Sequence, residues 1–179
     1  MATITIISAG TGMPSQCSIL ARCFANQLEE SCPTACIRIV ELRPLAGEIL
    51  RANLAEGTGP GLDAVLEQAN GSDALVMITP LHNSSYSGLF KMFADLLDTK
   101  AMRGKPVLLA ATAGTIRHSL ALDGPLRSLF AYFRALISPT VILATPSDWS
   151  EPGVAGTALS ERLARAAREV LTLAKERLQ

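Results

Sequence analysis

The sequence predicts an α/β fold, a doubly wound five-stranded parallel sheet in the order 2-1-3-4-5. Five short apolar or β-branched runs recur along the 179 residues, and each is followed by a loop and a helical pattern. Four of the runs are almost continuously apolar, as expected for parallel strands covered on both faces. No repeat, low-complexity tract or linker divides the chain, so we expect a single domain over residues 1–179. Right-handed crossovers make this strand order the simplest topology.

The predicted strands cover residues 3–8, 35–42, 74–79, 107–112 and 140–145. The second alternates apolar with charged residues and is therefore expected at an edge of the sheet. The predicted helices cover residues 18–30, 61–69, 89–97, 126–137 and 157–178, and the first and last carry apolar residues on one stripe.

Two of these helices, 89–97 and 126–137, are apolar on more than one face. A sheet can cover only one stripe of a helix, so we expect their remaining apolar surface to contact another copy of the chain. A homodimer or homotetramer would result. The alternative is that both helices are simply well buried.

Composition argues against several classes of function. The 16 Lys and Arg residues balance the 16 Asp and Glu residues, which argues against a nucleic-acid surface and an acidic electron carrier. No apolar run approaches the roughly 18 to 20 residues of a membrane span, and no basic leader is visible, so we expect a cytoplasmic protein. The cysteines form no C-x2-C pair and are interpreted as small apolar residues: Cys17, Cys23, Cys32 and Cys36.

Three loops rich in small and hydroxyl residues follow the first, third and fourth predicted strands. Parallel strands end at one edge of a sheet, and open α/β sheets bind ligands in the crevice at that edge. The first loop, residues 8–18, suits a phosphate because amides and hydroxyls converge there at the start of a helix. It is neither a Walker loop nor a complete dinucleotide fingerprint. A simple turn with an N-cap at Ser15 or Ser18 explains it equally well.

The other two loops suit the edges of a flat, polar ring. The third strand leads into Thr-Pro-Leu-His at residues 79–82 and Ser-Tyr-Ser-Gly at residues 85–88. The fourth ends in Thr-Ala-Gly-Thr at residues 112–115, where Gly114 permits close approach and successive amides can bind an anionic ring edge. A phosphate loop and two ring loops on one edge indicate FMN.

These loops resemble those of the NAD(P)H-dependent FMN reductase family. The resemblance rests on T-P-L-H-x-x-S-Y-S-G-L-F-K at residues 79–91, A-T-A-G-T-x-x-H at residues 111–118 and L-A-L-D at residues 120–123. Within the family, the chain is most similar to flavin reductases that supply reduced FMN to two-component monooxygenases, including the alkanesulfonate type. The resemblance implies a flavodoxin-like fold and hydride transfer from NADPH or NADH to N5 of FMN.

The resemblance also implies the residues of the site, none of them a catalytic acid or base. The phosphate would be held by Ser8, Ser15, Gln16, Cys17 and Ser18. The isoalloxazine would lie against Pro80, Leu81, His82 and Asn83 with Ser85 close by, and its pyrimidine side would face Thr112, Ala113, Gly114 and Thr115. The chain lacks the Arg that many relatives carry in the first loop, and it has Gly124 where some sulfonate-linked relatives carry an aromatic residue.

Two other functions stay open at this point. One is a quinone, azo-dye or metal-ion reductase with bound FMN, and the other is a non-enzymatic flavodoxin-like carrier. Asp148 and Trp149 begin a segment rich in Pro and Gly that could form a lid or a surface turn, and we expect the turn.

Overall fold

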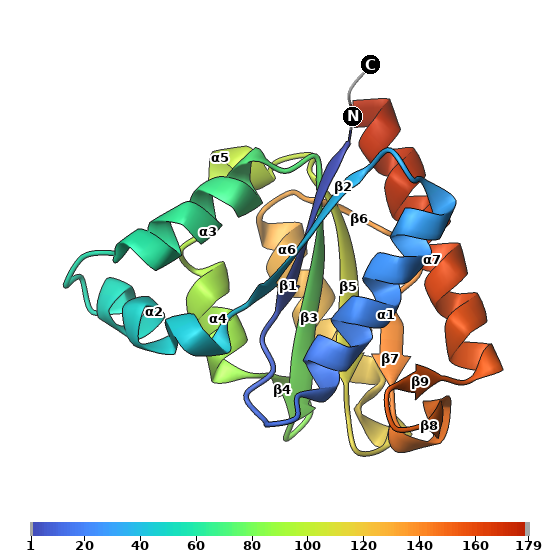
Figure 1. Cartoon of the computed structure of the whole chain (residues 1–179). Coiled ribbons are helices and arrows are strands. Elements are labelled where there is room, and N and C mark those ends of the chain that lie inside the picture. Colours follow the sequence, from blue (N-terminus) through green and yellow to red (C-terminus); the bar gives the residue numbers. More distant parts are fainter. Residues whose placement is uncertain (1, 178–179) are drawn as a thin grey trace.

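The structure is a computed structural model that describes residues 2–177, and a mostly parallel sheet forms its centre (Figure 1). The strands are β1 (Thr3–Ser8), β2 (Cys36–Glu41), β3 (Ala74–His82), β4 (Ser85–Tyr86), β5 (Pro106–Thr112), β6 (Leu136–Ile137), β7 (Ile142–Ala144), β8 (Trp149–Glu151) and β9 (Val154–Ala155). The order β2-β1-β3-β5, with β6 and β7 both pairing with β5, confirms the predicted order, because β5 and β7 are the fourth and fifth predicted strands. The edge position of the second strand is also confirmed.

Helices cover both faces of the sheet. They are α1 (Gln16–Ser31), α2 (Ala46–Asn53), α3 (Pro60–Gly71), α4 (Gly88–Ala94), α5 (Thr99–Met102), α6 (Arg127–Tyr132) and α7 (Thr157–Arg177). In Figure 1, α1 and α7 lie on one side of the sheet and α2, α3 and α4 on the other. The predicted end of the last helix at residue 178 lies outside the described residues.

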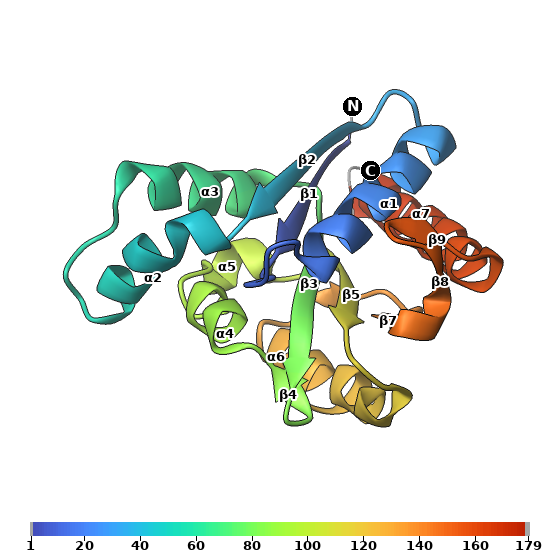
Figure 2. The same ribbon diagram turned by 60° about the horizontal axis from the view of Figure 1, so that its bottom comes forward.

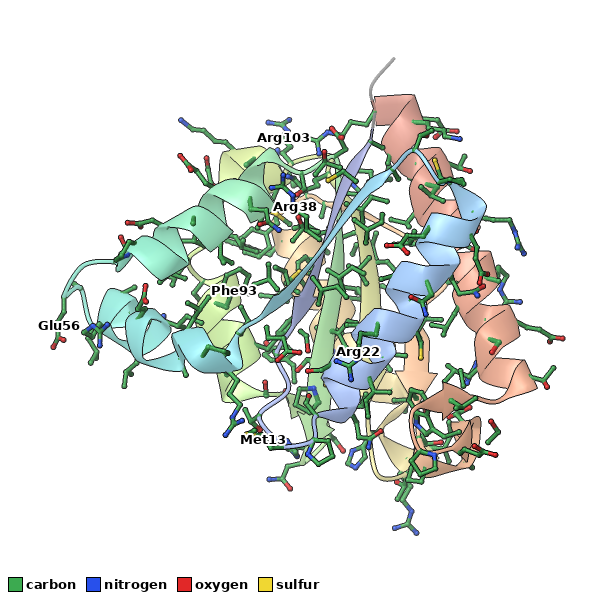
Figure 3. The ribbon with its side chains drawn as sticks, in the orientation of Figure 1. Met13, Arg22, Arg38, Glu56, Phe93 and Arg103 are labelled. Carbon is green, nitrogen blue, oxygen red and sulfur yellow. The ribbon has the colours of Figure 1, made fainter. Side chains whose placement is uncertain are left out.

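Alternate residues of each strand pack into two separate cores. Ile4 and Ile6 of β1 pack beneath α1 and α7, whereas Ile7 packs with the helices of the opposite face. Phe93 of α4, labelled in Figure 3, is completely buried in this second core. Because side chains of a strand point alternately to the two faces, apolar runs without alternation are what a sheet covered on both sides requires.

One predicted helix, residues 126–137, is wrong in its second half. A π-helical turn (Leu122–Leu126) leads into α6, which ends at Tyr132. Arg134 then has a φ of 56°, a left-handed conformation that stops the helix, and Leu136–Ile137 pairs with the start of β5 as β6. The apolar run therefore forms a helix in its first part and a strand in its second. Apolar residues on more than one face, which we interpreted as a helix that contacts another copy, arise partly from this strand.

A buried lysine joins β5 to the end of α3. Lys105 is fully inaccessible to solvent, and its Nζ donates hydrogen bonds to the carbonyl oxygens of Ala69, Asn70 and Ser72 at 2.9, 2.8 and 2.7 Å. These bonds satisfy carbonyls that the helix itself leaves unpaired at its C-terminal end. Within residues 2–177, no helix is both long and apolar enough to cross a bilayer.

Candidate functional site

A cavity of about 790 Å³ lies at the C-terminal edge of the sheet. Figure 2 brings this edge of the molecule toward the viewer. The volume of the cavity is within the range of small-molecule binding sites. Four segments line it: residues 10–12 and 14–17 after β1, residues 80–82 of β3, residues 112–114 at the end of β5, and residues 144–146 and 149–153 beyond β7.

The first segment is a tight turn that only glycine permits. Gly10 is buried, and a Cβ at this position would overlap the Oγ of Ser15 and lie 3.0 Å from the Cβ of Cys17. Ser15 is the N-cap of α1, where its Oγ accepts a hydrogen bond of 3.2 Å from the amide of Ser18. The turn thus places its backbone at the start of a 16-residue helix, whose first amides have no partner within the helix. Met13, labelled in Figure 3, marks the exposed tip of this loop.

The second segment is strand rather than loop, which corrects the sequence interpretation. β3 continues to His82 and returns as β4 through a two-residue turn in which Asn83 and Ser84 have φ of 51° and 62°. The Thr79 Oγ1 accepts a 3.1 Å hydrogen bond from the amide of Ser87, and this bond fixes the base of the hairpin. A two-residue turn with positive φ matches the right-handed twist of the two strands that it joins. The hairpin therefore fixes the backbone of residues 80–82 on the cavity wall.

The third segment is tied to the first by a buried hydrogen bond. The Cys17 Sγ and the Thr112 Oγ1 lie 3.1 Å apart and link α1 to the end of β5. Burial raises the pKa of Cys17 to about 11, against the opposing effect of the Thr112 hydrogen bond, so the side chain is a neutral thiol and no nucleophile. Gly114 follows, and a Cβ there would meet no atom within 4 Å.

The fourth segment was not predicted as part of the site. Strands β8 and β9 form an antiparallel hairpin, and residues 149–153 line the cavity, whereas we expected a surface turn. The signal that could have found it is the Pro152-Gly153 dipeptide, which is typical of a turn between two short strands, together with its place after the fifth predicted strand.

Nine of the fourteen predicted site residues lie on the cavity wall and five do not. On the wall are Ser15, Gln16, Cys17, Pro80, Leu81, His82, Thr112, Ala113 and Gly114. Away from it are Ser8, Ser18, Asn83, Ser85 and Thr115. Ser8 and Ser18 are buried behind the loop, Asn83 and Ser85 belong to the turn and return strand of the hairpin, and Thr115 caps the next turn by accepting from the amide of Arg117.

The cavity wall is almost neutral. Glu151 is the one carboxylate among the described residues that line it, and they include no Lys or Arg. In the part of the chain that the structure describes, no three His, Cys, Asp or Glu side chains form a group that could hold a metal ion.

The residues present fit FMN. A phosphate needs amides and hydroxyls at the start of a helix, and the turn before α1 places such groups on the cavity wall. The buried Ser8 Oγ at the end of β1 also has no hydrogen-bond partner, but it lies behind this turn and does not line the cavity. Neutral, partly apolar walls at Pro80, Leu81 and Ala113 suit a planar ring.

Comparison with known proteins identifies the family of the chain. A family model described as NADPH-dependent FMN reductase matches residues 2–150. The chain is 36% identical over 171 residues to an FMN reductase (NADPH) of Pseudomonas aeruginosa, covering 95% of this chain and 91% of that protein. It is 34% identical to the NADH-dependent FMN reductase SfnF of Pseudomonas fluorescens, covering 95% and 90%.

Solved structures support the same assignment. An oxidoreductase from Corynebacterium diphtheriae superposes with a TM-score of 0.86 at 36% identity and covers 98% of both chains. The apo form of an NADH:FMN oxidoreductase, EMOB, has a TM-score of 0.79 at 24% identity over 96% of this chain and 90% of its own, and shows the fold alone. The flavodoxin-like fold and the resemblance found in the sequence are confirmed, and the chain belongs to the NADPH-dependent FMN reductase family of oxidoreductases.

Proposed function

We propose that this chain reduces FMN with NADH or NADPH and passes the reduced flavin to a flavin-dependent monooxygenase. The observation that carries the proposal is one crevice in which a phosphate turn faces two wall segments suited to a planar ring. When bound, FMN would supply the redox chemistry by accepting a hydride, and no side chain need act as acid or base. The proposal assigns residues 1–179 to one reductase domain.

The chain's own groups would bind and orient the two reactants. Donors to the phosphate would be the hydroxyl of Ser15 and the amides of other non-proline residues that line this turn, Thr11, Gly12, Gln16 and Cys17. Pro80 and Leu81 would lie against the ring, and the amides of Ala113 and Gly114 would stabilise negative charge on its pyrimidine side. Cys17, as a neutral thiol, would serve as a packing contact.

The charge of the wall supports FMN as a dissociable substrate rather than a permanently held group. A phosphate dianion gains most from a basic side chain, and the described lining residues offer only neutral donors and the carboxylate of Glu151. We therefore propose that FMN exchanges with solvent during turnover, as a supplier of reduced flavin requires.

A homodimer or homotetramer is part of the proposal. Ile116, Leu120 and Tyr132 are 67%, 81% and 77% exposed, in the segment that follows the ring-binding end of β5. Large apolar side chains this exposed support association with another copy. Light scattering after size-exclusion chromatography measures the mass. We place the enzyme in the cytoplasm, where free cysteines such as those of this chain are kept reduced.

The test is oxidation of NADH or NADPH by the purified chain with free FMN added. We expect loss of nicotinamide absorbance that rises with FMN concentration and saturates, with the two donors ranked by kcat/KM. A protein that stays yellow through purification and turns over only when a quinone is added would support the bound-flavin reductase instead. Binding of FMN without reduction by either donor would support the carrier.

A further inference from the structure

The β8–β9 hairpin packs against the rest of the molecule at its base, through Trp149 and Ala155. Trp149 is half-buried: one side packs against the core beneath α1 and α7, and the residue also lines the cavity. Beyond it, residues 150–153 are all exposed. Among described residues, the tip has one weak polar link to α1, a 3.8 Å contact from the Cys23 Sγ to the Gly153 carbonyl oxygen. The position of this wall must therefore be fixed at its base.

Asp148, directly before β8, is the fixed point. Its Oδ2 accepts hydrogen bonds from the amide and the Oγ1 of Thr145 at 2.8 and 2.7 Å, and its carbonyl oxygen accepts from the amide of Gly156 at 2.8 Å. Both ends of the hairpin thus meet at one residue. Its Oδ1 accepts a hydrogen bond from Nη2 of Arg162 on α7, which is the long-range contact of the group.

This ion pair joins a fully hydrogen-bonded carboxylate, that of Asp148, to a guanidinium that is only partly paired. The side chains of Arg162 and Asp148 are 32% and 17% exposed, so both charges are partly desolvated. The Nε of Arg162 is buried without any hydrogen-bond partner, which is unfavourable. Whatever its net energy, the pair fixes Asp148 at the base of the hairpin to one position along α7.

We propose that Arg162 is a positioning residue of the flavin site: through Asp148 it holds the β8–β9 hairpin, and with it Trp149, as the fourth wall of the cavity against bound FMN. Arg162 itself does not line the cavity. The proposal rests on the proposed function for the identity of the ligand, whereas the anchoring of the hairpin is independent of it.

The experiment compares Arg162→Met with Lys91→Met in the full-length chain. Lys91 forms an ion pair with Asp95 at 2.6 Å on α4, and neither residue lines the cavity. Trp149 is the only tryptophan of the chain, so its emission reports on the hairpin without FMN and on binding when FMN is titrated. The melting temperature and the kcat and KM for FMN are measured on the same samples.

In Arg162→Met we expect red-shifted Trp149 emission with greater quenching by acrylamide, and Kd and KM for FMN raised about tenfold. The kcat at saturating FMN should stay within about twofold, because the ring-binding segments are untouched. Lys91→Met should leave emission, Kd and KM unchanged. A purely structural role would lower the melting temperature alone.

Two further variants keep the test decisive. Arg162→Lys should retain most of the wild-type affinity, and Asp148→Asn should weaken FMN binding at least as much as Arg162→Met, because it also disturbs the bonds from Thr145; the double variant should be no weaker than Asp148→Asn alone. If Arg162→Met does not fold, Asp148→Asn carries the comparison. Unchanged Kd and emission in the folded variants would overturn the proposal. If the wild-type chain bound no FMN, the proposed function would fail, and Trp149 emission would still test the anchor.

Discussion

Replacing Gly10 by Ala tests the phosphate turn most directly. The new Cβ would overlap the Ser15 Oγ and lie 3.0 Å from the Cβ of Cys17 and 3.1 Å from the Cβ of Ser15. Rotation of the Ser15 side chain relieves the first contact, but only a backbone shift relieves the other two. Losing the N-cap bond to Ser18 costs about 1 kcal/mol, and the crowding adds about 1–2 kcal/mol.

We expect Gly10→Ala to lower the melting temperature by roughly 4–12 °C, at about 2–4 °C per kcal/mol for a chain of this size. The displaced amides should weaken FMN binding by about tenfold or more, since about 1.4 kcal/mol of lost interaction has that effect. Differential scanning fluorimetry gives the first quantity, and titration of Trp149 fluorescence with FMN gives the second.

A double-mutant cycle with Ser15→Ala separates the overlap from the backbone shift. Removing the Oγ removes the closest contact, so Gly10→Ala should destabilise the Ser15→Ala chain less than the wild type. Gly47→Ala in α2 is the matched control, because its Cβ would be 3.6 Å from Arg51 Nη1, an ordinary contact, and alanine favours a helix. Strict additivity in the cycle, or wild-type FMN affinity in Gly10→Ala, would refute the close approach at this turn.

Three further variants probe the wall and the core. Gly114→Val should fold normally, since its Cβ meets no atom within 4 Å, but should lose measurable FMN binding in the same titration. Glu151→Gln should tighten FMN binding about two- to fivefold at low salt and less at high salt, because it removes a negative charge from the cavity wall; an unchanged Kd at low salt would contradict this. Lys105→Met should lower the free energy of unfolding by about 2–4 kcal/mol in urea, because three carbonyls lose their donor. Burial lowers the pKa of Lys105 to about 8 from 10.5, so the unfolded chain binds this proton more tightly than the folded chain does. The free energy of unfolding of the wild type, relative to that of Lys105→Met, should therefore rise as the pH is raised from 8 to 10.5.

The sheet could be predicted from the sequence because burial on both faces leaves a direct signature. β1, β3 and β5 are almost wholly buried runs, and their order follows from the handedness of crossovers. Elements that depend on tertiary contacts gave no such signal. The helix α2 buries only Ile49, and the helix-to-strand change near Arg134 requires a left-handed arginine that no sequence rule anticipates.

The candidate site, too, could be predicted from the sequence only in part. Its first three segments follow strands of one parallel sheet, so local composition and topology together were enough to bring them to one edge. The fourth segment carries a turn signal, yet a hairpin on the surface and a hairpin that forms a wall have the same local sequence. What distinguishes them here is the contact between Asp148 and Arg162, which depends on where α7 packs against the sheet. A cavity wall fixed by a distant helix leaves no local pattern, which is why a structure was needed to assign Trp149 to the site.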